Sequence, residues 1–200
     1  MQPTLTTPEN PFNGGNLALL GKLYSAERCH SLLDKLITTV NWNNDYCIVY
    51  GRKFHIPRLQ AWYGNEGIQY NYSNNLLKTQ PWSESLLAIK HDVQQRTACE
   101  FNSVLLTFYR NGNDYVNWHA DDEDELGSDP VIASLSLGAT RAFQYRHRPN
   151  GLTGNVHLRN GDLLLMQSAF QANWEHRVPS EPTINASRIN LTFRKVIPPR

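Results

Sequence analysis

Hydrophobic residues recur every three or four positions over about residues 26–40, which predicts an amphipathic helix. Ser25 is a suitable N-cap for it. A second helix is expected after Pro81 and Ser83. The apolar positions of the two helices are Cys29, Leu32, Leu33, Leu36, Ile37 and Val40, and then Leu86, Leu87, Ile89 and Val93. Between the helices, residues 46–75 are aromatic, basic and rich in loop-forming residues.

After Cys99 the pattern changes to short runs that are typical of β-strands. Eight such runs occupy residues 101–109, 114–121, 131–138, 141–147, 155–158, 162–166, 173–178 and 188–194. Turn-forming sequences separate several of them, as in "RNGN", "RPNG" and "RNGD". Many short strands with such turns predict a β-sandwich or jelly roll, so the fold class is mainly β with flanking helices (α+β).

Composition limits the chain to one compact unit. Its 200 residues and 40% hydrophobic content suit a single core. We expect a flexible lead-in at residues 1–20, a helical and loop-rich part at 21–98 and a β core at 99–200. The longest apolar runs are too short to cross a membrane, and the N-terminus does not resemble a secretion signal. Three scattered cysteines indicate a reducing, intracellular compartment. Because the net charge is only +1, any polyanion must bind through local patches.

The stretch "NWHADDEDELG" at residues 117–127 contains the first candidate chemistry. On a strand, His119 and Asp121 point to the same side, where they offer two ligands for a transition metal. The third ligand must come from the other histidines, which are His30, His55, His91, His147, His157 and His176. His176 lies on a late strand that a jelly roll can bring near. Two histidines and a carboxylate form the pattern of non-haem Fe(II) oxygenases, although His-x-Asp alone also occurs as a structural pair.

The run "RINLTFR" at residues 188–194 alternates polar and apolar residues. Arg188, Asn190, Thr192 and Arg194 share one face of this strand. Such a strand can simply turn its polar face to water. Alternatively, the polar face lines the inside of a small barrel, where two arginines require anionic partners. A dicarboxylate would satisfy them, because guanidinium binds carboxylate in a bidentate fork.

Together, these motifs resemble those of the AlkB family of Fe(II)/2-oxoglutarate-dependent nucleic-acid dealkylation dioxygenases. The resemblance runs from about residue 49 to residue 196 and is greatest to the branch that repairs alkylated bases in duplex DNA. It rests on "PRLQAWYG", "FNSVLLTFYRNGNDYVNWHADDE", "PVIASLSLGATRAFQYRH", "GDLLLM" and "SRINLTFRKV". It implies a double-stranded β-helix (jelly roll) with an N-terminal helical extension that carries a nucleotide-recognition lid.

The resemblance also implies the cofactors and their ligands. The family uses Fe(II), 2-oxoglutarate and O2, and His119, Asp121 and His176 correspond to its iron ligands. Arg188 corresponds to the arginine that pairs with the distal carboxylate of 2-oxoglutarate, and Arg194 to a second arginine near Asp121. Tyr109, Asn190 and Thr192 match polar residues of the same pocket. Thr107 stands where the family usually has Asn, and its hydroxyl can donate only one, shorter-reaching hydrogen bond.

Further positions match the family's contacts with nucleic acid. Glu123 corresponds to an acid that contacts the base, while the neighbouring acids are expected to form a solvated turn. Tyr50 and Gly51 fall at an intercalating finger, and Tyr70 and Tyr72 match residues that stack on a flipped base. Contacts with phosphates are expected from Arg58, Arg141, Arg146, His147, Arg148 and Arg159.

The resemblance therefore implies a monomeric DNA repair enzyme of the cytoplasm, nucleoid or nucleus that does not associate with membranes. Its substrates would be 1-methyladenine and 3-methylcytosine in double- or single-stranded alkylated DNA, and its products formaldehyde, succinate and CO2. Three alternatives remain at this stage. They are an RNA demethylase of the same family, a hydroxylase of proteins or small molecules on the same scaffold, and a non-catalytic jelly-roll module.

Overall fold

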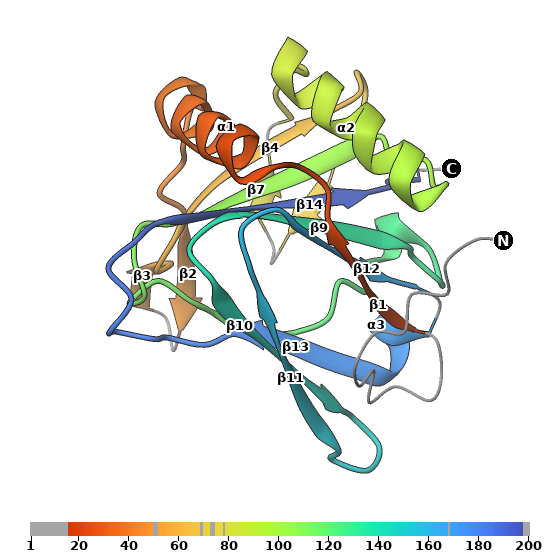
Figure 1. Cartoon of the computed structure of the whole chain (residues 1–200). Coiled ribbons are helices and arrows are strands. Elements are labelled where there is room, and N and C mark those ends of the chain that lie inside the picture. Colours follow the sequence, from red (N-terminus) through yellow and green to blue (C-terminus); the bar gives the residue numbers. More distant parts are fainter. Residues whose placement is uncertain are drawn as a thin grey trace, which may run out of the picture.

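Two antiparallel sheets face each other in the computed structural model, which describes residues 16–49, 52–68, 70–72, 75–77, 79–167 and 169–197. The larger sheet has six strands in the order β1 (Leu17–Lys22), β12 (Asp162–Met166), β9 (Ile132–Gly138), β14 (Arg188–Arg194), β7 (Ser103–Tyr109) and β4 (Leu59–Gly64). The smaller sheet has four, in the order β11 (Thr153–Leu158), β10 (Arg141–His147), β13 (Trp174–Val178) and β8 (Val116–His119). In Figure 1 the larger sheet lies between the two long helices and the smaller sheet.

The eight strands predicted after Cys99 are all present, as β7 to β14. Four of them lie in each sheet, and the chain crosses between the sheets from each of these strands to the next except at β10, which forms a hairpin with β11. The strands paired within each sheet run antiparallel. The expected fold class, mainly β with flanking helices in a double-stranded β-helix, is therefore confirmed.

Both predicted helices form where their caps indicate. Helix α1 (Ala26–Thr39) begins after Ser25, whose hydroxyl accepts a hydrogen bond from the backbone N–H of Arg28 at 3.3 Å. Helix α2 (Glu84–Thr97) begins after Ser83, which accepts from the N–H of Leu86 at 3.3 Å. One apolar position differs from expectation, because Leu87 is 47% exposed and faces away from the core.

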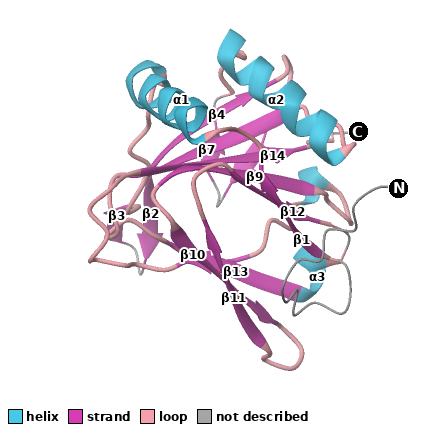
Figure 2. Ribbon diagram, viewed as in Figure 1, coloured by secondary structure: helices cyan, strands magenta, loops and turns pink. Residues whose placement is uncertain are grey.

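The two helices cover the outer face of the larger sheet, as the cyan ribbons of Figure 2 show. Ile189, Leu191 and Phe193 of β14 are completely buried there in a cluster with apolar residues of both helices. Because successive side chains alternate across a strand, the opposite face of β14 presents its polar residues to the space between the sheets. Arg188 and Arg194 are only 1% and 3% exposed, so the polar face of β14 lines the inside of the barrel and does not face water.

The larger sheet also contains strands that the sequence pattern did not predict. Strand β1 pairs with β12 and comes from the expected lead-in, so residues 17–20 are part of the sheet. Strand β4 pairs with β7 and comes from the aromatic, loop-rich region. That region also forms two hairpins, β2 (Tyr46–Val49) with β3 (Arg52–His55), and β5 (Tyr70–Tyr72) with β6 (Asn75–Leu77).

Two short helical segments complete the described chain. They are α3 (Phe170–Asn173), between β12 and β13, and the 3-10 helix η1 (Asp124–Leu126), which follows the His-x-Asp motif. None of the helices in the described ranges has the length and apolar character needed to span a membrane.

Candidate active site

Two histidines on adjacent strands and an aspartate that follows one of these strands form a group that can bind a metal. His119 on β8 and His176 on β13 are direct partners in the antiparallel register, and their ring centroids are 4.2 Å apart. Asp121 follows two residues after His119, where β8 has ended. One potential ligand atom from each of the three residues lies within 4.8 Å of the other two. The structure therefore selects His176 as the histidine that joins the His-x-Asp pair.

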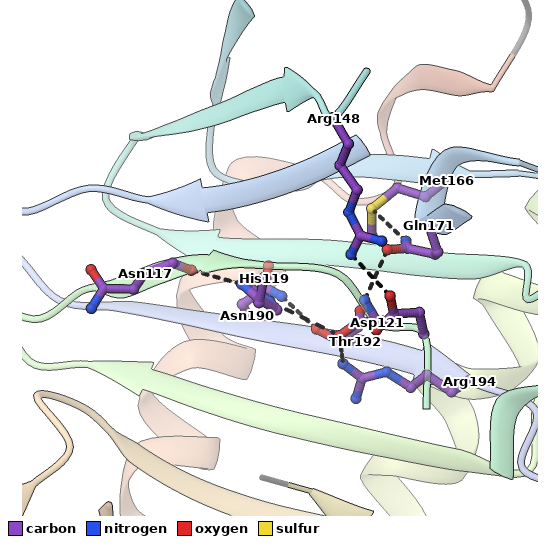
Figure 3. Close-up of polar contacts among 10 residues, drawn as sticks. Asn117, His119, Asp121, Arg148, Met166, Gln171, Asn190, Thr192 and Arg194 are labelled. Atoms are coloured by element: carbon purple, nitrogen blue, oxygen red, sulfur yellow. Dashed lines mark hydrogen bonds and ion pairs between the residues drawn. The ribbon is translucent and has the colours of Figure 1, made fainter. Parts of the chain in front are cut away.

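Neighbouring groups orient two of these ligands, His119 and Asp121 (Figure 3). The Nδ1 atom of His119 lies 2.8 Å from the carbonyl oxygen of Asn117, which leaves Nε2 as the metal-binding nitrogen. The backbone N–H of Asp121 donates to the side-chain oxygen of Gln171 at 2.9 Å. The Arg194 guanidinium donates to Asp121 Oδ1 at 2.9 Å, and both side chains are almost fully buried. Gln171 thereby fixes the backbone of Asp121, and Arg194 fixes its carboxylate.

The electrostatics of the group favour a bound cation. Burial, reinforced by the neighbouring His119, lowers the pKa of His176 to about 3. Burial also lowers the pKa of His119, although Asp121 opposes this. Burial alone would raise the pKa of Asp121, but the charge of Arg194, together with the two imidazoles when they are protonated, outweighs burial and lowers that pKa. At neutral pH the group therefore holds two neutral imidazoles and a carboxylate, the protonation states that a divalent metal requires.

The polar face of β14 continues from this group into a pocket that opens to solvent. All the residues predicted to bind the cosubstrate line this pocket, namely Thr107, Tyr109, Arg188, Asn190, Thr192 and Arg194. Because β7 and β14 are neighbours in register, Arg188 pairs with Tyr109 and Asn190 pairs with Thr107. The structure thus brings these predicted residues together with the metal ligands, while their individual roles remain predictions.

Arg188 shows the clearest need for an anionic ligand. Its Nη2 atom donates to Ser136 Oγ at 2.9 Å and to Asn190 Oδ1 at 2.8 Å. Its Nε and Nη1 atoms are buried and meet no acceptor of good hydrogen-bond geometry among the described residues, although the side chain of Tyr109 lies close to the guanidinium. Burial lowers the pKa of the guanidinium, opposed by Tyr109 and reinforced by Arg141. A buried cation with two unused donors fits a carboxylate, so these residues suit the distal end of 2-oxoglutarate.

A chain of hydrogen bonds keeps Arg188 in this position. Asn190 accepts from Ser134 Oγ at 3.0 Å and donates to Thr192 Oγ1 at 2.8 Å. Asn190 and Thr192 therefore support the arginine within the pocket wall. Ser134 and Ser136 on β9 were not predicted, although two serines that alternate with apolar residues in "ASLSL" were a usable signal. Gln171 was not predicted either, because α3 is too short to give a periodic pattern.

The residues predicted to contact a base are only partly described. Arg58 is 8% exposed, donates to the carbonyl oxygen of Tyr115 at 3.2 Å and lines the pocket, so it is not on an outer surface. Glu123 is partly buried and immediately precedes η1. Tyr70 and Tyr72 lie on β5, but their side chains fall outside the described part of the structure. Tyr50 and Gly51 lie outside the described residues altogether.

The predicted phosphate-binding cluster divides into two groups. Arg146 and Arg148 are about 40% exposed. They lie on or next to the β10–β11 hairpin, which projects from the body of the molecule in Figure 1. Arg146 forms an ion pair with Glu175, and Arg148 forms one with Asp122. Asp122 is therefore exposed and solvated, as expected for its part of the acidic run.

Arg141 is only 1% exposed, and protein oxygens occupy its donors. The expectation that Arg141 contacts phosphate is wrong, because no nucleic acid can reach it.

Comparisons with known proteins agree with this geometry. The sequence model of the 2OG-Fe(II) oxygenase superfamily matches residues 16–194. Alpha-ketoglutarate-dependent dioxygenase alkB homolog 3 of Bos taurus is 43% identical over 199 residues, which cover 94% of this chain and 69% of that protein. The Homo sapiens protein of the same name is 42% identical, over 84% of this chain and 61% of its own length. DNA oxidative demethylase ALKBH2 of Homo sapiens is 38% identical, over 74% of this chain and 60% of its own length.

A solved structure supports the fold independently. The structure of OsALKBH1 superposes with a TM-score of 0.64 at 16% identity and covers 92% of this chain and 100% of that one. At this level of identity the similarity concerns the fold alone. The sequence matches and the triad together establish more: the chain belongs to the 2OG-Fe(II) oxygenase superfamily, within its AlkB group, and is a dioxygenase that uses Fe(II), 2-oxoglutarate and O2.

Proposed function

We propose that this chain is a nucleic-acid demethylase that removes methyl groups from N-alkylated bases, with 1-methyladenine and 3-methylcytosine in DNA as its substrates. The observation that supports this proposal most directly is a single pocket that contains both the His119, Asp121 and His176 group and an arginine with two donors that no described residue accepts from in good geometry. The relative that is named a DNA oxidative demethylase, at 38% identity, supports the choice of substrate.

Within this proposal the chain's own residues bind and orient the cofactors. His119, Asp121 and His176 hold Fe(II) on one face, and Arg194 keeps the carboxylate of Asp121 in place. Arg188 binds the distal carboxylate of 2-oxoglutarate, and the ring of Tyr109 lies beside the guanidinium of Arg188. When bound, Fe(II) supplies the chemistry that uses O2 to convert 2-oxoglutarate to succinate and CO2, and an N-methyl group to an N–H group and formaldehyde.

The charges around the pocket suit a cationic base. A 1-methyladenine or 3-methylcytosine ring is positively charged, and carboxylates such as that of Glu123 attract it and accept from its exocyclic amine. Arg58 would repel such a ring, so we assign it to a neutral or anionic oxygen of the flipped nucleotide. Arg58 lines the same pocket as His119 and lies close enough for its charge to lower the pKa of that imidazole, which supports this assignment.

The remaining contacts with nucleic acid complete the proposal. Tyr70 and Tyr72 stack on the flipped base, and Tyr50 with Gly51 forms the finger that fills the gap in the duplex. Arg146 and Arg148 on the projecting hairpin bind phosphates after exchanging their carboxylate partners for the backbone. The enzyme acts as a monomer on alkylated DNA.

The test is a demethylation assay with Fe(II), 2-oxoglutarate and O2. The substrates are oligonucleotides with 1-methyladenine or 3-methylcytosine, offered as single-stranded DNA, duplex DNA and RNA, and mass spectrometry follows loss of the methyl group. H119A removes a proposed metal ligand, and H157A is the matched control because His157 is exposed and lies outside the pocket. Loss of the methyl group from DNA with H157A, but not with H119A, is the expected result.

Other outcomes select among the alternatives. Faster loss from RNA than from either form of DNA would make the chain an RNA demethylase. Consumption of 2-oxoglutarate without demethylation of any oligonucleotide would reject nucleic acid and favour a hydroxylase of proteins or small molecules. Binding of 2-oxoglutarate without any turnover would indicate a non-catalytic module.

A further inference from the structure

A buried arginine that the proposed reaction does not use lies next to the cosubstrate pocket. Arg141, the first residue of β10, is 1% exposed and is one of the largest fully buried side chains in the described part of the protein. Burying a guanidinium is expensive unless its donors are satisfied, so such a residue requires an explanation.

Arg141 connects two loops at one end of the barrel. Its guanidinium donates to the backbone carbonyl oxygens of Asn111 and Asp114 at 3.3 and 2.8 Å, in the loop after β7. It also donates to the carbonyl oxygen of Pro179 at 2.6 Å and to Glu181 Oε2 at 2.9 Å, in the loop after β13. These four acceptors occupy all three guanidinium nitrogens, which fixes the plane of the group.

The two loops also contact each other directly. Gly112 donates its N–H to the carbonyl oxygen of Ile184 at 2.7 Å and accepts from the N–H of Glu181 at 2.7 Å. A Cβ atom at Gly112 would lie 1.8 Å from the carbonyl oxygen of Glu181, so only glycine permits this approach. The loops connected by Arg141 therefore form one closely packed unit.

This unit adjoins the anion-binding end of the pocket. The guanidinium carbon of Arg141 lies 5.4 Å from the ring centroid of Tyr109, and that of Arg188 lies 5.1 Å from the same centroid. Tyr109 is 3% exposed, and its ring thus contacts both cations. Replacing Arg141 by an uncharged residue would release the Tyr109 ring that lies against Arg188. It would also remove a positive charge near the place where a dicarboxylate binds.

We propose that Arg141 is a positioning residue of the 2-oxoglutarate pocket, which orients Tyr109 against Arg188 and contributes positive potential to the anion site. Its ion partner Glu181 acts in the opposite sense, because its carboxylate offsets that potential. The inference rests on the proposed binding of the cosubstrate at Arg188 and is independent of which base or strand is the substrate.

The test measures 2-oxoglutarate binding by calorimetry on the Mn(II)-loaded protein, which needs no turnover. We expect R141M to raise the Kd for 2-oxoglutarate about tenfold, a change typical of one displaced supporting residue. The Kd for Mn(II) and the Kd for an alkylated oligonucleotide should stay within twofold of the wild type. R141K keeps the positive charge but loses the planar guanidinium group, so it should recover part of the affinity for 2-oxoglutarate.

E181Q tests the same idea without removing the arginine. Its amide oxygen can still accept from Arg141, but the negative charge is gone, so 2-oxoglutarate should bind about two- to threefold more tightly. Weaker binding of 2-oxoglutarate by E181Q would contradict the contribution of Arg141 to the positive potential of the anion site. If R141M does not fold, E181Q alone tests that contribution.

Two results would overturn the inference. The first is a folded R141M protein with a Kd for 2-oxoglutarate within twofold of the wild type. The second is an R141M protein that loses Mn(II) binding to the same extent, since this would indicate a general structural role. R188M separates this inference from the proposed cosubstrate site. If R188M binds 2-oxoglutarate normally, the site itself is misplaced; if R188M is impaired and R141M is not, only the role of Arg141 fails.

Discussion

Replacing Arg188 by methionine should separate cosubstrate binding from folding. The side chain is buried, it uses one guanidinium nitrogen to bind Ser136 and Asn190, and it keeps Nε and Nη1 for a ligand. Methionine has a similar length and flexibility, so it can fill the space without leaving a large cavity. We therefore expect R188M to fold and to lose most of its affinity for 2-oxoglutarate.

The magnitude follows from the two unused donors. A hydrogen bond to a charged group contributes about 1.5 kcal/mol at the lower end of its range, so losing two of them costs about 3 kcal/mol. This energy corresponds to a rise in Kd of roughly 150-fold. The stability of the ligand-free protein should change less, because relief of a buried charge offsets the two lost hydrogen bonds to Ser136 and Asn190.

Equilibrium unfolding in urea with and without 2-oxoglutarate measures this effect, with Mn(II) present and O2 absent. At a ligand concentration of about 100 times the wild-type Kd, the wild type should gain about 2.7 kcal/mol of unfolding free energy, and R188M about 0.3 kcal/mol. R96M on α2 is the matched control, because Arg96 is exposed and does not line the pocket. A gain above 2 kcal/mol in R188M would refute the assignment of the distal carboxylate to Arg188.

Three further predictions concern the metal ligands and the core. Q171L removes the acceptor for the backbone N–H of Asp121, so the Kd for Mn(II), measured by calorimetry, should rise about tenfold. F193A deletes a fully buried ring and should lower the unfolding free energy in urea by about 3–5 kcal/mol; a loss below 1 kcal/mol would contradict its place in the core. The pKa of His176 is about 3 in the folded protein and 6.5 in the unfolded chain. Between these pH values the unfolded metal-free chain therefore binds more protons than the folded protein. The unfolding free energy should fall as the pH falls through this window, by at most about 1.4 kcal/mol per pH unit. H176Q should show a shallower slope, and an equal slope would refute the buried, neutral state of His176.

Local patterns were sufficient to predict most of the fold. The eight core strands alternate or form short apolar runs between turns, and both long helices combine a serine cap with helical periodicity. The missed strands β1 and β4 are edge strands of the larger sheet, and their partners β12 and β7 are distant in the sequence. Pairing of this kind depends on tertiary contacts that a local pattern does not contain.

The candidate site was predictable to the extent that it lies on regular strands. Period-2 alternation placed Arg188, Asn190, Thr192 and Arg194 on one face, and the structure puts that face inside the barrel. Spacing alone could not choose the third metal ligand among six histidines, and the resemblance to a family was needed to select His176. The pairing of His176 with His119 in the antiparallel register supplies the physical reason for that choice.

Arg141 shows why the remaining part could not be predicted. Arginines usually lie at the surface, so a basic residue near a turn was assigned to phosphate binding. The acceptors that bury this arginine are mostly backbone carbonyl oxygens of two loops, at residues 111–114 and 179. Backbone carbonyl groups are present at every residue, so the sequence does not reveal which of them converge on one side chain.

Strand β14 combines completely buried apolar residues on one face with a buried, incompletely hydrogen-bonded arginine on the other. On its outer face Ile189, Leu191 and Phe193 are completely buried under the helices, and each contributes about 1.5–3 kcal/mol by leaving water. On its inner face Arg188 retains two donors that no described residue accepts from in good geometry. The apolar face holds the strand rigidly, so the arginine cannot relax toward solvent, and the unused donors remain directed at the place where an anion binds. A substitution that weakens the outer face, such as F193A, should therefore also reduce affinity for 2-oxoglutarate, although Phe193 does not line the pocket.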